Sequence, residues 1–254
     1  MPYDTIVLIT GAKTGIGKGL LATYAQRPNT LAIAAIRDGP DSSPAQTLTS
    51  LSVGEGSKVL VAKYDAGSPT AAEELANDLR DKYEITHLDV VIANAGILKA
   101  YGPARTVKFE DLQEHLLINT IAPILLYQQT APLLEHSKQE TPRFFIISST
   151  LGSNALMDNY PLQLIAYGMS KAAVNFAAGR IHREEERIAI IPVQPGWVQT
   201  AMGEKAAAFA GMEAKDVPTT LEESVSGLMK VFDGATKEGQ SGRFWDQEGK
   251  EVPW

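Results

Sequence analysis

Two side chains that can move a proton stand at positions i and i+4 in the segment YGMSK. This spacing would place Tyr167 and Lys171 on one face of a helix. A phenol has an unperturbed pKa of about 10 and is mostly protonated at neutral pH. An ammonium nearby would favour the phenolate and lower that pKa. The pair therefore predicts a general acid for an alkoxide, or a general base for an alcohol.

Serine hydroxyls at the end of the apolar run RFFIIS could serve the same chemistry. Ser148 and Ser149 end the run, and Ser153 lies closer to Tyr167 along the chain. A hydroxyl at the carboxyl end of a parallel strand points into the crevice where open α/β sheets bind ligands. There it could donate to a carbonyl oxygen on which charge develops. We favour Ser149 because the strand ends there, and Ser153 is the alternative.

A glycine-rich turn near the amino terminus has the pattern of a phosphate-binding site. The segment TGAKTGIG, residues 10–17, follows an apolar run and precedes a helical pattern. Its glycines allow a tight turn, and the helix that follows would offer free N–H groups to a pyrophosphate. The segment predicts a dinucleotide cofactor, and a plain turn that needs glycine is the alternative.

The next apolar run ends beside a residue that distinguishes the two nicotinamide cofactors. Arg37 stands about 20 residues after Gly17, where arginine accommodates a 2′-phosphate. Ile36 occupies the position where a carboxylate would favour NAD(H), and Asp38 comes one position late. NADP(H) is therefore favoured over NAD(H). Lys13 could add charge to the same phosphate, or it could be an ordinary exposed lysine of a loop.

Apolar, β-branched runs that alternate with helical patterns would position these groups. The expected strands are 5–10, 31–36, 58–64, 88–93, 143–148 and 188–193, with a short one at 242–245. The expected helices are 17–25, 70–82, 109–135, 166–186 and 220–231. Most of the strands are apolar on both faces, as buried parallel strands are. The alternation predicts an α/β fold, a Rossmann-type doubly wound parallel sheet of about seven strands with helices on both faces.

Two segments are expected to be loops. Residues 38–56 are rich in Pro, Ser, Thr and Gly and leave room for only a short helix, and residues 200–218 contain no clear strand. Thr220 and Glu223 predict a capping box at the start of the last helix. Because the strand–helix rhythm resumes after each loop, neither segment is a linker, and we expect one domain over residues 1–254.

Composition narrows the classes of function. The chain has 23 basic and 30 acidic residues and a net charge of −7, which argues against a nucleic-acid partner. It has no cysteine and only four scattered histidines, so no metal site is expected. No apolar run is long enough to span a bilayer, and the first residues lack the pattern of a signal peptide. We expect no membrane partner and a cytoplasmic location.

The motifs occur in the order typical of the short-chain dehydrogenase/reductase family, which the chain resembles over nearly its whole length. In chain order they are the turn Thr10–Gly17, Asn94-Ala95-Gly96, Asn119, Ser148-Ser149, Tyr167 with Lys171 as YxxxK, and Pro195–Thr200. Each motif alone is modest, whereas six in order are specific. One departure is that the family usually places its serine closer to the tyrosine. The extra residues, within 151–165, are expected to form a longer loop beside the substrate pocket.

The resemblance implies an NADPH-dependent carbonyl reductase, or ketoreductase, that transfers hydride between nicotinamide and a ketone, aldehyde or secondary alcohol. Lys171 would tune Tyr167 and bind the nicotinamide ribose, and Asn119 would hold a water that relays protons. The implied catalytic residues are Ser149, Tyr167, Lys171 and Asn119. The expected cofactor contacts are Gly11, Lys13, Thr14, Gly15, Ile16, Gly17, Arg37, Asp65, Ala66, Asn94, Ala95, Gly96, Tyr167, Lys171, Pro195, Gly196, Val198 and Thr200.

The resemblance extends to one branch of the family and to its assembly. The long serine–tyrosine spacing and the ending from Gly242 to Trp254 are similar to carbonyl reductases of the norsolorinic-acid-ketoreductase-like branch. The family implies a homodimer or homotetramer paired through the helices that carry Asn119 and Tyr167, although the small residues there could equally pack on the sheet. The expected pocket walls, 99–105, 152–165 and 200–218, contain Leu, Met, Tyr, Phe and Ala, which favours an apolar or aromatic carbonyl compound as the small-molecule substrate.

Two other functions are compatible with the same fold. A non-catalytic NADP-binding regulator or scaffold would have no need for serine, tyrosine, lysine and asparagine together, so the complete set argues against it. An isomerase or dehydratase of this family usually carries a separate substrate lobe, for which 254 residues leave little room.

Overall fold

The apolar runs of the sequence form one sheet, with strand order β3-β2-β1-β4-β5-β6-β7-β8. The strands are β1 (Thr5–Thr10), β2 (Thr30–Ile36), β3 (Lys58–Lys63), β4 (Val90–Ala93), β5 (Arg143–Ile147), β6 (Ala189–Gln194), β7 (Phe244–Asp246) and β8 (Glu251–Val252). Strands β1 to β7 pair in parallel, and β8 pairs antiparallel with β7. The predicted Rossmann-type parallel sheet is confirmed, with one short strand more than the seven expected.

The structure is a computed structural model that describes residues 3–160 and 162–254. Residues 1–2 and 161 lie outside the described residues. Residues 1–2 belong to the predicted domain and to the amino-terminal segment that lacks a signal-peptide pattern, and residue 161 belongs to the predicted loop within 151–165. These predictions are therefore described only at their other positions.

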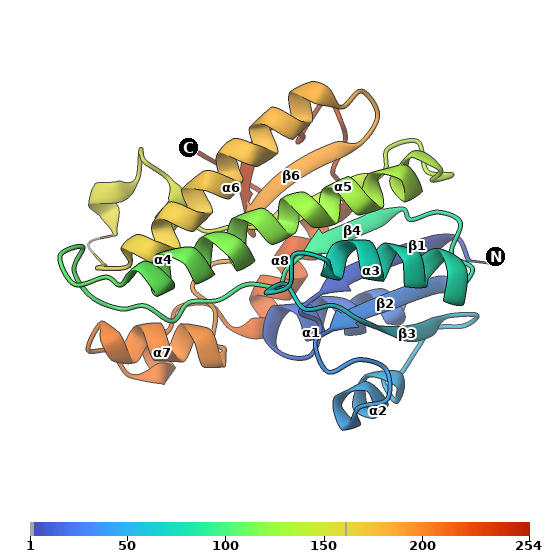
Figure 1. The fold of residues 1–254 in the computed structure, drawn as a ribbon, viewed down its shortest axis with the longest axis horizontal. Helices are drawn as coiled ribbons and strands as arrows, with labels where there is room; N and C mark the ends of the chain where they lie inside the picture. The colour runs from blue at the N-terminus through green and yellow to red at the C-terminus, as the bar shows by residue number, and fades with distance from the viewer. Residues whose placement is uncertain (1–2, 161) are drawn as a thin grey trace.

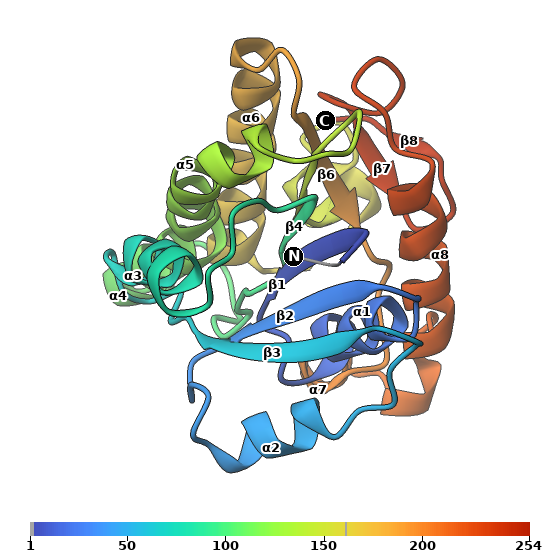
Figure 2. The same ribbon diagram turned by 90° about the vertical axis from the view of Figure 1, so that its right-hand side faces the viewer.

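Helices cover both faces of the sheet, as Figures 1 and 2 show. They are α1 (Gly15–Ala25), α2 (Ser43–Thr49), α3 (Ala71–Asn77), α4 (Phe109–Leu116), α5 (Ala122–Glu135), α6 (Ile165–Glu184), α7 (Ala201–Phe209) and α8 (Leu221–Asp233). One hydrophobic cluster joins α3, α5 and α6 to one face, and a second joins α1, α2 and α8 to the other. Two buried layers of this kind make the sheet a rigid platform for its carboxyl-terminal edge.

The expected loop 200–218 is corrected, because it contains α7. The side chain of Thr200 caps this helix by accepting the N–H of Gly203, and alanines, which favour helix, fill much of the helix. The short helix allowed in 38–56 is present as α2. The capping box of Thr220 and Glu223 is confirmed at the start of α8.

Two of the expected helices contain a π-helical turn that the sequence pattern did not predict. Residues 70–82 form α3 followed by the π turn Asp78–Lys82, and residues 109–135 form α4, the π turn Leu117–Ile121 and α5. Hydrophobic periodicity does not distinguish one wide turn within a long helix. The second of these turns contains Asn119.

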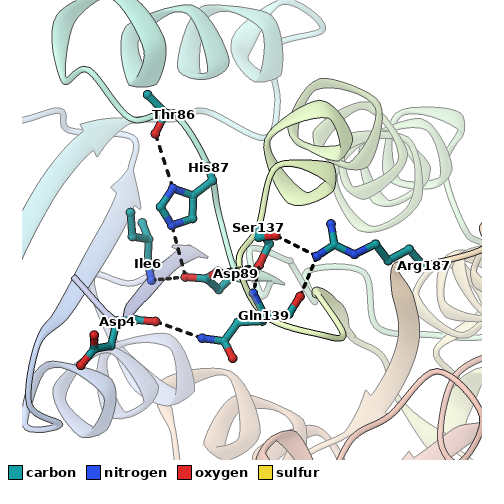
Figure 3. Close-up of polar contacts among 8 residues, drawn as sticks. All are labelled: Asp4, Ile6, Thr86, His87, Asp89, Ser137, Gln139 and Arg187. Atoms are coloured by element: carbon teal, nitrogen blue, oxygen red, sulfur yellow. Dashed lines mark hydrogen bonds and ion pairs between the residues drawn. The ribbon is translucent and has the colours of Figure 1, made fainter. Parts of the chain in front are cut away.

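A buried polar cluster ties the strands together at the amino-terminal edge of the sheet, opposite the candidate site (Figure 3). Asp89 accepts the N–H of Ile6 at 2.7 Å and the hydroxyl of Ser137 at 2.6 Å, and His87 Nε2 lies 3.9 Å from the same carboxylate. Arg187 donates to the carbonyl of Ser137 at 2.7 Å. Asp89 is 1% exposed, so the Ile6 N–H and the Ser137 hydroxyl replace the water that its carboxylate loses on folding.

None of the helices in residues 3–160 and 162–254 has the length and apolar character needed to cross a bilayer.

Candidate active site

The glycine turn and the segment after β4 interlock at the carboxyl ends of two neighbouring strands. Asn94 Nδ2 donates to the carbonyls of Thr10 and Gly11 at 2.8 and 3.3 Å, and the Thr10 hydroxyl accepts the N–H groups of Asn94 and Ala95. A Cβ at Gly17 would lie 2.4 Å from Asn94 Nδ2, so the close approach requires glycine. The side-chain amide of Asn94 is thus committed to shaping the turn.

The start of α1 has the features of an anion-binding helix end. Thr14 precedes the helix without a side-chain capping bond, and the first turn holds no acidic residue. Gly15 has φ +56°, and a Cβ there would meet only Thr200, at 3.5 Å and beyond. The N–H groups of the turn therefore lack a side-chain acceptor and are open to a ligand oxygen. The residues present fit the pyrophosphate of a dinucleotide.

Charged side chains flank this turn at the ends of β1 and β2. Lys13 Nζ forms an ion pair with Asp38 at 2.9 Å, and the hydrogen bond lowers the pKa of the Asp38 carboxyl. Arg37 is exposed, and none of the ion pairs found in the described residues includes it. The structure therefore places Lys13 and Arg37, both predicted to meet a 2′-phosphate, at the neighbouring ends of β1 and β2. Lys13 is paired there with the Asp38 carboxylate.

The remaining predicted adenine contacts lie beyond β3. Asp65 is exposed and accepts the N–H of Gly67 at 3.0 Å, as a turn residue does. Ala66 is buried in the core cluster. Both follow the carboxyl end of β3, on the same edge as the glycine turn, which suits either a turn or a ligand contact at Asp65.

The helix α6 places Tyr167 in a half-buried position and Lys171 in a buried one. Lys171 Nζ lies 5.6 Å from the centre of the Tyr167 ring and donates to the carbonyl of Ile147 at 2.7 Å. Lys171 is 5% exposed, and this burial lowers the pKa of its ammonium to about 8. A lysine has three donors, so two of its N–H bonds are free of the Ile147 contact.

Burial dominates the ionisation of Tyr167. It raises the pKa of the phenol to about 12, while a hydrogen bond with Ser149 acts in the opposite direction and Tyr101 adds to the increase. The expectation of a lowered tyrosine pKa is therefore wrong in this structure. Loss of hydration outweighs the lowering effect of the Ser149 hydroxyl, and the phenol is held protonated at neutral pH.

The three candidate serines make different contacts. The Ser149 hydroxyl acts to lower the pKa of Tyr167, which places it near the phenol, and it accepts the N–H of Leu151 at 3.2 Å. Ser148 donates to Asn175 Oδ1 at 2.6 Å, and Ser153 donates to the carbonyl of Pro253 at 2.6 Å. Of these three hydroxyls, the structure brings that of Ser149 to the tyrosine.

Asn119 joins three elements from within its π turn. Its Oδ1 accepts the N–H of Ile97 at 2.8 Å, and its Nδ2 donates to the Ile97 carbonyl at 2.9 Å and to Ser170 Oγ at 3.0 Å. The residue four positions later is Pro123, which has no N–H, so the Asn119 carbonyl lacks its α-helical donor. A Cβ at Gly96 would lie 3.1 Å from Asn119 Oδ1 and 3.8 Å from Lys171 Nζ, so the Asn119 side chain lies near the ammonium.

Two glycines bring the segment after β5 against α6, and the close contact at Gly152 was not predicted from the sequence. A Cβ at Gly152 would lie 2.5 Å from the carbonyl carbon of Lys171, and one at Gly168 would lie 2.8 Å from the Leu151 carbonyl oxygen. Ser170, which bonds Asn119, was also missed. The glycine inside YGMSK was a usable signal, because glycine within a helix often marks close backbone approach.

The segment after β6 turns sharply toward the site. Gly196 has φ +87°, and the Pro195 carbonyl accepts the hydroxyl of Ser224 at 2.7 Å. Val198 bridges to Thr219, and Thr200 caps α7. These predicted nicotinamide contacts lie at the carboxyl end of β6, on the same edge as the glycine turn.

Tyr101, which helps to raise the pKa of Tyr167, lies where the expected wall segments meet. Its ring is 5.1 Å from that of Phe209 in α7, and the Gly102 N–H donates to the Gln163 carbonyl at 2.9 Å. All three expected wall segments therefore meet, and their contacts are apolar or made by backbone. Within the described ranges, no three His, Asp or Glu side chains gather in a way that could hold a metal ion.

A family model described as short chain dehydrogenase matches residues 5–210. The chain belongs to this family. It is 38% identical to a norsolorinic acid ketoreductase of Aspergillus parasiticus, in an alignment that covers 100% of this chain and 92% of that protein. A norsolorinic acid ketoreductase of Dothistroma septosporum is also 38% identical, with 98% of this chain and 92% of that protein covered.

Among solved structures, the chain is similar to an NADPH-bound carbonyl reductase from chicken fatty liver, with a TM-score of 0.82 and 28% identity over the full length of both chains. A carbonyl reductase from Pseudomonas aeruginosa has a TM-score of 0.77 and 26% identity, over 98% of this chain and 100% of that one. The family is thus shown by sequence and by fold, and a nicotinamide cofactor is what this fold binds.

Proposed function

We propose that this protein is an NADP(H)-dependent carbonyl reductase, or ketoreductase, built on one domain. The observation that carries the proposal is the group formed by half-buried Tyr167 and Ser149 with buried Lys171, at the same edge of the sheet as the glycine turn. The names of the relatives support it, since two of them are ketoreductases of similar length, and a solved neighbour is a carbonyl reductase that binds NADPH.

The reaction follows from the protonation state of the tyrosine. The bound cofactor supplies a hydride to the carbonyl carbon. Tyr167, protonated because burial raises its pKa to about 12, gives its proton to the oxygen as the hydride arrives, so the carbonyl becomes an alcohol. Ser149 donates to the same oxygen and stabilises the charge that develops there.

Lys171 and Asn119 then restore the acid. The Lys171 ammonium faces the ring of Tyr167 and stabilises the phenolate left after proton transfer. Because its pKa is near 8, Lys171 can pass a proton on at neutral pH. We assign the Asn119 carbonyl, to which Pro123 offers no N–H, as an acceptor on a proton path from solvent to Lys171.

The preference for NADP(H) rests on the corner formed by Arg37 and Lys13. Both cations follow strands that end at the glycine turn, so a 2′-phosphate of the adenosine ribose would meet two positive side chains there. The Lys13–Asp38 ion pair is exposed and therefore weak, and a phosphate can replace the carboxylate.

The experiment follows the absorbance of NADPH with a panel of aromatic and aliphatic ketones. Tyr167→Phe removes the proton donor and keeps the ring, and we expect kcat to fall by about a hundredfold to ten-thousandfold. Tyr83→Phe is the matched control, since Tyr83 also loses one hydrogen bond, to the Val61 carbonyl, but lies outside the site. Full activity of Tyr167→Phe would contradict the mechanism, and tight NADPH binding without turnover of any ketone would favour a binding protein instead.

A further inference from the structure

The two residues after β8 contact the loop between β5 and α6. Ser153 Oγ donates to the Pro253 carbonyl at 2.6 Å, and the Ala155 N–H donates to the Trp254 carbonyl at 3.0 Å. The Trp254 ring lies 6.0 Å from that of Phe244 in β7, which ties this end of the chain to the sheet. In Figure 1 the carboxyl end lies on the same side as the yellow loop that precedes α6.

Ser153 is buried and its hydroxyl is fully engaged. The residue is 2% exposed, and its oxygen accepts the N–H of Leu156 at 3.2 Å while donating to Pro253. Its own N–H donates to the Thr150 carbonyl at 2.9 Å. A hydroxyl with its proton already donated to a backbone carbonyl has none to offer a substrate, so Ser153 acts on the loop itself.

Gly152 and Ser149 connect Ser153, with its contact to Pro253, to the catalytic groups. Gly152 precedes Ser153, sits against the backbone of Lys171, and donates its N–H to the Ser149 carbonyl at 2.9 Å. Ser149 in turn lies near Tyr167, where its hydroxyl acts to lower the pKa of the phenol. Because the packing at Gly152 leaves no room for even a methyl group, a shift at Ser153 cannot be absorbed there and must reach Ser149.

We propose that Ser153 is a positioning residue. The contacts of the loop 150–160 with the backbone of Pro253 and Trp254, here called the brace, hold Ser149 against Tyr167. They also fix this loop as one wall of the substrate pocket. The kinetic consequence of this proposal rests on the proposed carbonyl reductase function, whereas the placement of the loop by Ser153 does not. The inference assigns Ser153 to loop placement and leaves the contact with the carbonyl oxygen to Ser149.

The test compares Ser153→Ala with the wild-type chain. We expect KM for a bulky aromatic ketone to rise about tenfold, the effect of losing one buried hydrogen bond, with KM for a small ketone rising less. The dissociation constant for NADPH, followed by fluorescence, stays unchanged. Hydrogen exchange at the amides of 151–156 becomes faster, because their acceptors move.

Ser57→Ala is the matched control. Ser57 also accepts a backbone N–H, from Thr30 at 2.8 Å, and donates to a backbone carbonyl, that of Arg27, at the opposite end of the sheet. It should leave both the KM ratio and the exchange at 151–156 unchanged. If Ser153→Ala does not fold, Trp254→Ala removes a ring that is 40% exposed and tests the same brace.

Three results would overturn the proposal. A fall in kcat of about a hundredfold with KM unchanged would make Ser153 a donor to the substrate. Unchanged hydrogen exchange at 151–156 in Ser153→Ala would show that Ser153 does not hold the loop in place. An equal change in KM in Ser57→Ala would show that the effect comes from general destabilisation. If the wild-type chain reduces no ketone, the proposed function fails by itself, and the exchange comparison still decides whether Ser153 braces the loop.

Discussion

At the scale of the residue, burial decides the chemistry of the candidate site. Tyr167 and Lys171 shift in opposite directions, to pKa values of about 12 and about 8, because each neutral form is favoured away from water. Neutral tyrosine is the form that donates a proton to a carbonyl oxygen. The sequence placed both residues correctly on one helix face, but it could not show burial, so the sign of the tyrosine shift was predicted wrongly.

The lowered pKa of Lys171 makes a prediction about stability. The unfolded chain holds the lysine proton up to about pH 10.5, whereas the folded chain releases it near pH 8. Between these values the unfolded state binds more protons, so stability rises with pH. We expect wild type to gain about 2 kcal/mol over Lys171→Met between pH 7.5 and 9.5, measured by urea unfolding. A constant difference between the two proteins would contradict the buried ammonium.

Arg37 makes a prediction about the cofactor. On the proposal that Arg37 binds a 2′-phosphate by charge-assisted hydrogen bonds, we expect Arg37→Ser to raise KM for NADPH about ten- to a hundredfold while KM for NADH changes little. Steady-state kinetics with both cofactors measure the split. Arg180→Ser, on the exposed far part of α6, removes the same charge from a pair with Glu184 and should change neither value. An equal loss for NADH would contradict the assignment.

At the scale of the element, close backbone approach builds the site. The π turn before α5 and the glycine contacts between α6 and the segment after β5 bring Asn119, Ser149 and Lys171 together. The strands and most helices could be predicted, because apolar periodicity is local. The π turn could not be predicted, because it is defined by backbone geometry that hydrophobic periodicity does not show. The helix α7 was missed because its alanine-rich sequence, bounded by glycine, contains no strand signal and was interpreted as a loop.

Two glycines of α6 form a matched pair for this account. A Cβ at Gly168 would meet the Leu151 carbonyl oxygen at 2.8 Å, whereas one at Gly179 would meet nothing within 4 Å. We expect Gly179→Ala to stabilise the protein by up to about 1 kcal/mol, as alanine does in a helix. Gly168→Ala should destabilise it by about 1–3 kcal/mol and lower kcat. Thermal unfolding and ketone reduction measure both, and equal effects would contradict the tight contact.

At the scale of the whole molecule, one sheet edge gathers every predicted site segment. The turn after β1 and the segments after β2, β3, β4, β5 and β6 all lie at carboxyl ends of parallel strands, and Figure 2 shows helices covering both faces beneath them. Parallel order makes this convergence predictable from the sequence. What could not be predicted is the pairing of Ser153 with residues after β8, because it joins positions far apart in the chain. The assembly as a homodimer or homotetramer stays a prediction.

The most direct test of the central claim is hydride transfer itself. The protein is incubated with NADPH that carries two deuterium atoms at C4 of the nicotinamide, together with an aromatic ketone, and the alcohol is analysed by mass spectrometry and NMR. We expect one deuterium on the carbinol carbon and a greatly reduced yield with Tyr167→Phe. Alcohol without deuterium, or the same yield from Tyr167→Phe, would contradict it.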